Sequence, residues 1–322
     1  MKNINLSIIV PVFNEEESLN PLYNQLTEVL CRLKLNYEII FVDDGSDDQG
    51  FSILKKIADK DKRIKIIQLK KNFGQTAAIS AGIDYAQGEV IITIDADLEN
   101  DPKDIPRLLS KLDEGFDIAS GWRKNRWKDK PLTRRLTSQV ANFLISKIVG
   151  LKLHDYGCTL KAYRKNVIKE INLYGEMHRF IPALAFWQGA KIAEVEINYK
   201  PRKFGQSKYG IERVIKVLLD LVTLKFLSGY TTKPIHFFGK IGFISMFLGF
   251  LTFLWALYYK LTGKKDFIET PLPIAIVLFI VLGILLILIG LLAEIIIRIY
   301  HESQNKKIYL IRKKINFRNY EK

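Results

Sequence analysis

Short apolar runs rich in β-branched residues alternate with stretches of helical period over residues 1 to about 208. The runs are LSIIVPVF (6–13), EIIFVDD (38–44), KIIQLK (65–70), EVIITIDAD (89–97) and DIASG (117–121). The helices predicted between them cover Glu16–Leu33, Asp48–Asp59, Thr76–Ala86 and Asp104–Asp113. Strands that are apolar throughout are buried on both faces. The alternation therefore predicts an α/β domain, residues 1–208, with a mostly parallel central sheet and helices on both sides.

Polar residues follow three of these predicted strands. They are Asn14 and Glu15, Asp43 and Asp44, and Asp95 and Asp97. In an open parallel sheet the ligand binds at the carboxyl ends of the strands. We therefore expect these side chains to converge on one crevice.

The pattern changes after residue 208. Residues 209–233 are mostly apolar but carry five charged side chains, at positions 212, 213, 216, 220 and 225. Such a segment is too charged to cross a membrane and too apolar for a solvated helix. It indicates either interfacial helices in the headgroup plane or a core helix of the first domain.

Two long apolar stretches lie within residues 234–300. Phe237–Tyr259 is interrupted by Lys240 near its start, and Leu272–Ile297 by Glu294 near its end. Each is longer than the ~20 residues that an α-helix needs to cross a bilayer. The sequence therefore predicts two transmembrane helices, at about 237–259 and 272–297.

Charge predicts the orientation of these spans. Residues 301–322 form a basic tail, which the positive-inside rule places in the cytosol. Two spans return the chain to its starting side, and the first residues, MKNINLSIIVPVFNEEES, have too short an apolar run for a signal peptide. We expect a multi-pass protein of the cell (inner or plasma) membrane, with its N-terminal domain and C-terminus in the cytosol.

The amino-acid composition limits the class of binding partner and the cellular compartment that we expect. The net charge of +15 indicates an anionic partner, such as nucleic acid, a phosphorylated substrate or an anionic membrane surface. Cys31 and Cys158 form no disulfide or zinc-binding pattern. We therefore expect a reducing compartment.

The triplet Asp95-Ala96-Asp97 ends the fourth predicted strand. Burying unpaired carboxylates is costly, so two acids at this point need a cation. Mg²⁺ or Mn²⁺ held by carboxylates and substrate phosphates fits the triplet, and Glu99 could complete the ligand set. The alternative is a turn with helix-capping acids, but the position at the end of a buried strand favours a metal site.

The segment Asp43-Asp44-Gly45-Ser46 ends the second predicted strand. An acid here can accept hydrogen bonds from a nucleobase or a ribose hydroxyl. The alternative is a strand-to-helix turn with Asp or Ser as the N-cap. Both hold if one Asp binds while its neighbour fixes the loop, and we favour Asp44 as the contact.

Basic residues in several loops suit phosphate oxygens. They are Arg123, Arg126, His178, Arg179, and Arg202 and Lys208 beside Ser207. Each has a structural alternative: Arg123 could pair with an Asp, His178 could be buried, and the loop of residues 201–208 could be a solvated linker. Arg126 opens a basic cluster, residues 126–135, that would face a membrane or solvent. Asp155 is either a catalytic base or a turn residue.

Five ordered segments resemble glycosyltransferase family 2, which has the GT-A fold. They are Pro11–Glu15, Val42–Ser46, Asp95–Leu98, Gly121–Arg123 and Arg202–Lys208. Within the family the chain resembles, over nearly its whole length, the polyisoprenyl-phosphate glycosyltransferases, which include dolichol-phosphate mannose synthase and the bactoprenol glucosyltransferases. The processive members carry a Q-x-x-R-W motif that Asn125-Arg126-Trp127 does not complete. This departure indicates transfer of a single sugar.

The resemblance implies roles for individual residues. The nucleoside would be contacted by Pro11, Phe13, Glu15 and Asp44. Metal and donor would be bound by Asp95 and Asp97. The diphosphate or the acceptor phosphate would be contacted by Arg123 and Arg202. Many relatives have Gln at the position of Glu99. The candidate catalytic residues are Asp97, Asp155 and Arg123.

We therefore expect an inverting glycosyltransferase that moves one sugar, glucose from UDP-glucose, onto undecaprenyl phosphate at the cytosolic membrane face. It would use Mg²⁺ or Mn²⁺, form a homo-oligomer and bind no nucleic acid. The alternatives are transfer of mannose or a modified arabinose, glycolipid or polysaccharide synthesis on another acceptor, and a nucleotide-binding membrane scaffold without turnover. A phosphate monoester has a second pKa of about 6, so Asp155 is expected to orient the acceptor more than to deprotonate it.

Overall fold

The computed structural model describes residues 4–126, 142, 145–147, 149–171, 173, 177–201, 234–263, 266–303 and 307–317. It divides into two compact units, residues 1–217 with 307–322, and residues 218–306. The predicted interfacial segment 209–233 lies outside the described residues, as do Arg202, Ser207, Lys208 and residues 127–135 of the basic cluster.

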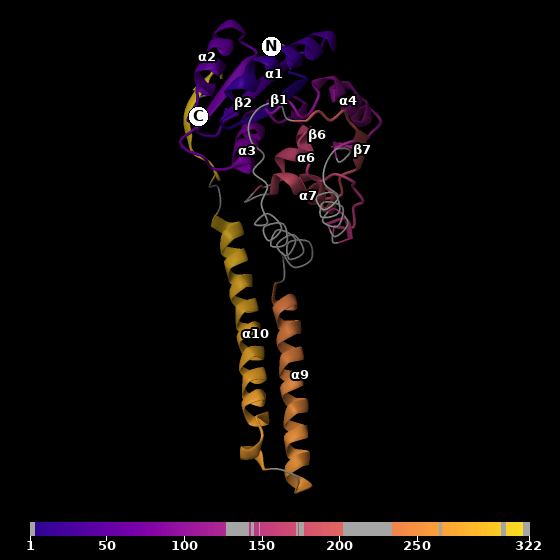
Figure 1. Cartoon of the computed structure of the whole chain (residues 1–322), viewed down its shortest axis with the longest axis vertical. Helices are drawn as coiled ribbons and strands as arrows, with labels where there is room; N and C mark the ends of the chain where they lie inside the picture. The colour runs from indigo at the N-terminus through magenta and orange to yellow at the C-terminus, as the bar shows by residue number, and fades with distance from the viewer. Residues whose placement is uncertain are drawn as a thin grey trace. The chain divides into compact units, whose positions relative to one another are not determined.

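One eight-stranded sheet forms the centre of the first unit (Figure 1). Its strands are β1 (Leu6–Val12), β2 (Tyr37–Asp43), β3 (Ile64–Leu69), β4 (Val90–Thr93), β5 (Ile118–Trp122), β6 (Lys161–Arg164), β7 (Ile192–Glu196) and β8 (Ile311–Ile315). They lie in the order β7-β5-β6-β4-β1-β2-β3-β8. Strands β6 and β8 run antiparallel to their neighbours, and the other neighbouring pairs are parallel. The predicted fold class, α/β with a mostly parallel sheet, is confirmed, although β6 unexpectedly separates β4 from β5.

Helices cover both faces of this sheet. They are α1 (Glu16–Arg32), α2 (Gly50–Lys60), α3 (Gln75–Tyr85), α4 (Ile105–Asp113), α6 (Lys165–Lys169) and α7 (Ile181–Trp187), with short 3₁₀ turns η1 (Pro102–Asp104) and η2 (Met177–Phe180). Successive side chains of a strand point to opposite faces. In β1, Ile8 and Val10 join the core under α1, α2 and α4, whereas Ile9 joins the core under α3, α6 and α7. Burial on both faces explains why the central strands are apolar throughout.

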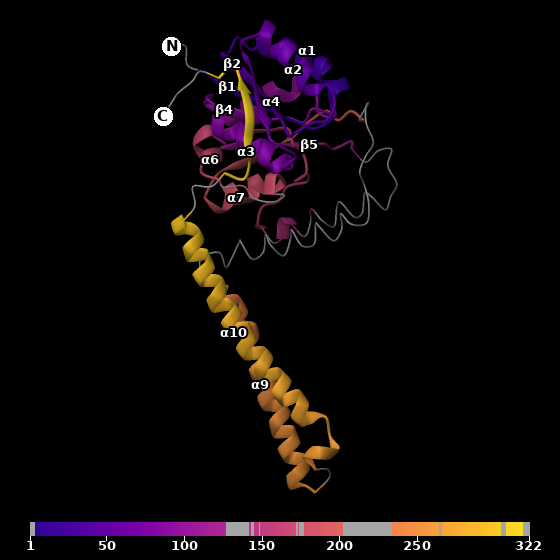
Figure 2. The same cartoon turned by 90° about the vertical axis from the view of Figure 1, so that its left-hand side faces the viewer.

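The sheet ends in a strand from the C-terminal part of the chain, drawn in yellow in Figure 2. Strand β8 pairs antiparallel with β3, with Ile66 opposite Ile315 and Gln68 opposite Lys313. Its three central side chains, at positions 312–314, are basic and exposed. Charges on an outermost strand discourage pairing with further chains. Residues 311–315 are therefore part of the N-terminal domain's sheet rather than of a separate basic tail.

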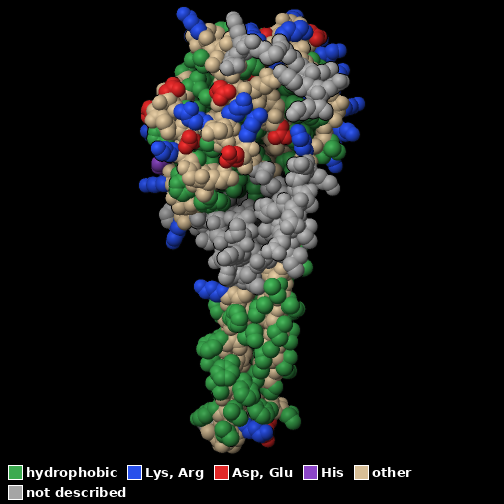
Figure 3. Space-filling model, turned by 180° about the vertical axis from the view of Figure 1, so that it is seen from behind, with side chains coloured by type: hydrophobic (Ala, Val, Ile, Leu, Met, Phe, Trp, Pro, Cys, Tyr) green, Lys and Arg blue, Asp and Glu red, His purple; other side chains and the backbone are tan. Residues whose placement is uncertain are grey.

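The second unit is an antiparallel helical hairpin, α9 (Pro234–Leu261) and α10 (Leu272–Ser303), joined through the 3₁₀ turn η3 (Phe267–Glu269). The segments Phe238–Leu261 and Leu272–Ala293 are long and apolar enough to cross a membrane. Hydrophobic side chains cover the face of the hairpin that Figure 3 shows.

Small residues bring the two helices of the hairpin together. A Cβ atom on Gly242 would lie 2.7 Å from the carbonyl oxygen of Gly283. The Ser245 hydroxyl donates a hydrogen bond to the carbonyl oxygen of Phe279 at 2.8 Å. Small residues and interhelical hydrogen bonds are what hold helices together where the surroundings are as apolar as the side chains.

Candidate active site

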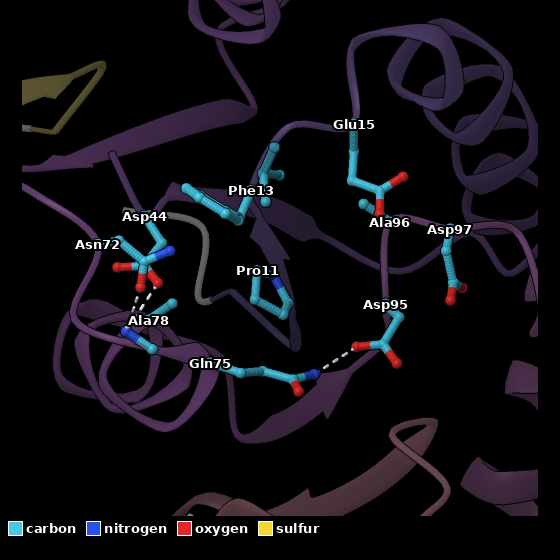
Figure 4. A pocket seen from close by; sticks show the side chains of 12 residues that line it. Pro11, Phe13, Glu15, Asp44, Asn72, Gln75, Ala78, Asp95, Ala96 and Asp97 are labelled. Carbon is cyan, nitrogen blue, oxygen red and sulfur yellow. Dashed lines mark hydrogen bonds between the residues drawn. The ribbon is translucent and has the colours of Figure 1, made fainter. Parts of the chain in front are cut away.

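A cleft of about 280 Å³ lies where β1, β2, β3 and β4 end. It is lined by Pro11, Val12, Phe13, Glu15, Asp44, Asn72, Gly74, Gln75, Ala78, Asp95, Ala96 and Asp97. Figure 4 shows Asp44 and Asn72 on one side of Pro11 and Phe13, and Asp95 and Asp97 on the other. The structure thus brings together seven of the residues that the sequence predicted for nucleotide-sugar and metal binding.

Asp44 fixes the loop that follows β3. Its two carboxylate oxygens accept hydrogen bonds from the backbone N–H groups of Phe73 and Gly74, at 2.8 and 2.9 Å. Burial raises the pKa of Asp44, and these two hydrogen bonds act in the opposite direction. Each carboxylate oxygen has a second lone pair, so Asp44 can hold the loop and still accept a hydrogen bond from a ligand in the cleft.

Asp43 has a different environment. Its side chain is fully buried and accepts hydrogen bonds from the Ser46 backbone N–H at 3.0 Å and from Gln68 Nε2 at 3.2 Å. It does not line the cleft. Both aspartates therefore fix loops, and Asp44 is the one of the two that also lines the cleft.

Asp95 and Asp97 form the acidic end of the cleft. Asp95 accepts hydrogen bonds from Gln75 Nε2 at 2.7 Å and from the Thr159 hydroxyl. Burial raises the pKa of Asp95. Burial, together with the negative charges of Asp95 and Glu99, raises the pKa of Asp97 to about 7. Two neighbouring carboxylates that resist ionisation are the donor set expected for a divalent cation, which would favour their charged forms.

The turn after Asp97 is strained. Leu98 has a φ of 62°, in the left-handed region that leucine rarely adopts. This turn lets the Glu99 backbone N–H donate to the Asp97 carboxylate at 3.1 Å. Strain of this kind concentrates at ligand sites, where the surrounding structure fixes the backbone. Here it holds the Asp97 side chain at the mouth of the cleft.

Glu99 forms an ion pair with Arg123. Its carboxylate lies 3.6 Å from Arg123 Nη1. Over the described ranges of the chain, no three His, Cys, Asp or Glu side chains are grouped closely enough to hold a metal ion. Asp95 and Asp97 line the cleft, whereas Glu99 does not. That Glu99 completes the ligand set of the cation stays a prediction.

Arg123 and Asp155 form a buried ion pair beside the acidic residues. Arg123 is 4% exposed, and its Nε and Nη2 atoms lie 2.7 and 3.1 Å from the two Asp155 oxygens. Burial alone would raise the pKa of Asp155, but the charge and hydrogen bonds of Arg123 lower it overall. A carboxylate with a lowered pKa is a poor proton acceptor at neutral pH. In this structure Asp155 is the ion-pair partner of Arg123.

Thr159 and Lys161, just before and at the start of β6, were not among the site residues predicted from the sequence. Thr159 binds Asp95, and the buried Lys161 donates hydrogen bonds to the carbonyl oxygens of Tyr156 and Cys158 at 3.2 and 2.5 Å. Burial lowers the pKa of Lys161 to about 8. Lys161 thereby fixes the loop that carries Asp155, and it adds a positive charge near Asp95.

The loop after β3 and the first residue of α3 supply Asn72, Gly74 and Gln75, which were not among the predicted site residues. The polar segment Asn72-Phe73-Gly74-Gln75-Thr76 follows a predicted strand, as the three acidic segments do. The rule that strand ends converge applies equally to it.

Among the residues that the structure describes, the predicted phosphate contacts His178, Arg179 and Arg126 do not line the cleft. His178 is buried, and its Nδ1 atom lies 2.7 Å from the Thr76 hydroxyl at the start of α3. Arg179 follows it in η2. The Arg126 backbone N–H donates to the Arg123 carbonyl oxygen at 3.0 Å. Whether these side chains meet a phosphate stays a prediction.

Comparisons with known proteins identify the family of this chain. Residues 7–172 match the family model described as glycosyl transferase family 2. Dodecaprenyl-phosphate galacturonate synthase from Rhizobium johnstonii is 40% identical over 316 residues, covering 97% of this chain and 93% of the relative. Undecaprenyl-phosphate 4-deoxy-4-formamido-L-arabinose transferase from Salmonella choleraesuis is 36% identical over 312 residues, covering 96% and 93%.

Solved structures support the fold. Glucosyl-3-phosphoglycerate synthase from Mycobacterium tuberculosis, in complex with Mn²⁺ and UDP-glucose, superposes with a TM-score of 0.54 at 16% identity, covering 70% of this chain and 79% of that one. This likeness shows a shared GT-A architecture. With the family match and the two relatives that align along nearly the whole chain, it shows that this protein belongs to glycosyl transferase family 2, among the polyisoprenyl-phosphate glycosyltransferases.

Proposed function

We propose that the enzyme transfers one glycosyl residue from a nucleotide sugar to the phosphate of a polyisoprenyl lipid, with inversion, at the cytosolic face of the cell membrane. The observation that carries the proposal is the pairing of Asp95 and Asp97 at one end of a cleft whose other end is Asp44 and Asn72. This spacing of an acidic end and a nucleoside end suits a diphosphate-linked donor. The names of the relatives and the apolar hairpin support a lipid phosphate as the acceptor.

Asp95 and Asp97 would hold Mg²⁺ or Mn²⁺. When bound, the cation neutralises the charge that develops on the departing nucleoside diphosphate. Gln75 and Thr159 keep Asp95 oriented for this role, because groups that bond a metal ligand fix its direction and basicity. Pro11, Phe13 and Glu15 would contact the nucleoside beside Asp44.

In the transfer step, an oxygen of the lipid phosphate forms a bond to the anomeric carbon. The bond from that carbon to the donor diphosphate breaks on the opposite face. The phosphate monoester is already anionic at neutral pH, since its second pKa is about 6. No general base is required, which agrees with the lowered pKa of Asp155. Arg123, held by Asp155, would balance the phosphate charge with Arg202 and Lys208.

The sugar is best sought among the donors of the relatives. Their names specify galacturonate and 4-deoxy-4-formamido-L-arabinose, whereas the family resemblance led us to expect glucose from UDP-glucose. We infer that a uronic acid or a modified pentose is transferred in preference to glucose. The long shared alignment supports this ranking.

The test is a donor panel with purified full-length protein, undecaprenyl phosphate and Mn²⁺ or Mg²⁺. The donors are the UDP derivatives of galacturonate, 4-deoxy-4-formamido-L-arabinose and glucose, and GDP-mannose. We expect one labelled sugar in a mild-acid-labile lipid phosphate, and at least about a hundredfold slower transfer with Asp97→Asn. Transfer to diacylglycerol, or addition of several sugars to one lipid, would contradict the proposal.

A further inference from the structure

The segment of residues 307–317, which we call the C-terminal segment, contacts two elements that lead to the donor cleft, the β3–α3 loop and helix α3. The chain leaves the catalytic domain, forms the apolar hairpin and returns to add β8 to the same sheet. Strand β8 lies against β3, and β3 leads directly into the loop that lines the cleft with Asn72, Gly74 and Gln75.

The first contact is at the start of that loop. The ladder between β3 and β8 is irregular at Gln68 and Leu69. Just beyond it, the Lys70 backbone N–H donates to the Leu310 carbonyl oxygen at 2.8 Å. The backbone N–H groups that Asp44 binds begin three residues later, at Phe73. The loop is thus fixed from the β2 side by Asp44 and from the sheet edge by Leu310.

The second contact is at the far end of α3. Tyr309 is 3% exposed, and its hydroxyl donates to Asp84 Oδ2 at 2.7 Å. Lys307 Nζ lies 3.3 Å from the same carboxylate. Burial and the bond to Asp84 raise the pKa of Tyr309, so the phenol stays protonated as the donor. The N-terminal end of the same helix carries Gln75, which binds Asp95.

Further contacts hold the C-terminal segment in register. Asn316 Nδ2 donates to the carbonyl oxygens of Ala58 and Ile64, at 2.7 and 2.8 Å. The Phe317 ring meets the Tyr85 ring edge to face, with centroids 5.4 Å apart. These contacts bracket β3 and the C-terminal end of α3. Because the segment is held at several points, it can fix the positions of β3 and α3, which it contacts.

We propose that the C-terminal segment is a positioning element for the donor cleft, with Tyr309 as its main side chain. By fixing the β3–α3 loop and α3, it sets where Asn72, Gly74 and Gln75 face the nucleotide and where Gln75 holds Asp95. The inference rests on the proposed function for the identity of the ligand. It predicts that loss of the segment weakens donor binding and leaves the affinity for the lipid acceptor nearly unchanged.

The experiment compares full-length protein with chains that end at residue 306 or at residue 317. The second chain keeps the whole C-terminal segment and is the matched control. We expect removal from residue 307 to lower the affinity for UDP with Mn²⁺, and to raise the donor KM, by at least about tenfold, as loss of several hydrogen bonds should. A synthetic peptide of residues 305–318 should restore part of the affinity by adding a strand to the open edge.

Tyr309→Phe tests the idea where the truncated chain fails to fold. It keeps the ring and removes the bond to Asp84, so the donor KM should rise about two- to tenfold, with the acceptor KM unchanged. Arg312→Ala, on the exposed part of β8, should change neither constant. Amide hydrogen exchange at Phe73 and Gly74 should speed up in Tyr309→Phe, whether or not the enzyme transfers sugar.

Exchange and binding separate this inference from the proposed function. A wild-type protein that makes no glycosyl lipid would overturn the proposed function, while faster exchange in Tyr309→Phe would still support the C-terminal segment's role. Wild-type exchange at Phe73 and Gly74 in Tyr309→Phe, together with an unchanged donor KM, would overturn the inference.

Discussion

Arg123 grips Asp155 through two nitrogens, with Nε 2.7 Å and Nη2 3.1 Å from the carboxylate oxygens. The pair is almost wholly excluded from solvent. Removing one partner of such a pair leaves a buried charge uncompensated, at a cost of about 3–5 kcal/mol. The pair therefore serves the shape of the site as much as its charge.

Asp155→Asn should separate these roles. The free energy of unfolding of the variant should be lower by roughly 3 kcal/mol. The variant should retain measurable transfer, because Asn can still accept one hydrogen bond from Arg123. Asp97→Asn should lose at least about a hundredfold in kcat. Glu196→Gln, which breaks the exposed pair with Lys124, is the matched control and should alter stability by under about 1 kcal/mol. Equal and total loss of transfer in Asp155→Asn and Asp97→Asn, with both folded, would mark Asp155 as the base.

Metal affinity should rise with pH through neutrality. The pKa of Asp97 is about 7 in the metal-free site, and a ligand must lose its proton to bind a cation. Below pH 7 protons compete with the metal, so Mn²⁺ affinity should fall by about tenfold per pH unit. Above about pH 8 it should level off. Mn²⁺ titrations followed by electron paramagnetic resonance between pH 5.5 and 8.5 would measure this, and a flat profile would contradict the assignment of Asp97.

Gln75→Ala should weaken metal binding without removing a ligand. Gln75 donates to Asp95 at 2.7 Å, and losing a group that orients a metal ligand costs about 10- to 100-fold in affinity or activity. Gln75→Glu would add a negative charge beside Asp95 and should raise the Asp95 pKa further. Asn166→Ala, in α6 and outside the cleft, is a control of similar size. A Gln75→Ala enzyme with wild-type Mn²⁺ dependence would show that the contact is incidental.

The hairpin should place its turn on the opposite side of the membrane from Cys31. Cys31 is exposed on α1 and Cys158 is buried, so the natural cysteines already mark the catalytic domain. Thr262→Cys, in the exposed turn after α9, should react with an impermeant maleimide in intact cells. Cys31 should react only after the membrane is opened. Labelling of Cys31 in intact cells would reverse the proposed orientation.

Removing the hairpin should cost acceptor use and spare donor binding, provided that β8 is kept. The design replaces residues 231–304 by a flexible linker, so that residues 307–322 can still pair with β3. UDP affinity should stay within about threefold, since the cleft is intact, whereas turnover with a long-chain lipid phosphate should fall sharply. Full-rate transfer by this soluble form to long-chain lipid would refute a role for the hairpin in acceptor binding.

The sequence predicted the elements that repeat a local pattern. The four helices after the first four apolar runs begin and end within two residues of α1, α2, α3 and α4, because burial of one helical face leaves a clear period. Strand β6 escaped because it is four residues long and begins with the buried Lys161. Strand β8 escaped because its charged centre looks like a solvated tail, and only its pairing with β3 makes it a strand.

The candidate site was also predictable in part. Pro11 was predicted from the resemblance to glycosyltransferase family 2. Asp44, Asp95 and Asp97 were predicted because each lies at the end of a predicted strand, and such ends meet. Their supporting partners left no local signal. Gln75 and Thr159 lie 20 and 64 residues from Asp95 in the chain, and only the folded sheet brings them together.

The return of the chain to β3 has a consequence for biogenesis. Ile66 pairs with Ile315, and every residue of the hairpin is translated between these two residues. The nascent catalytic domain therefore keeps one sheet edge open while α9 and α10 are synthesised, and long-range pairing of this kind is slow to form. A chaperone or the membrane insertion machinery has that interval in which to engage the unfinished domain, and the enzyme matures only after its hairpin has been made.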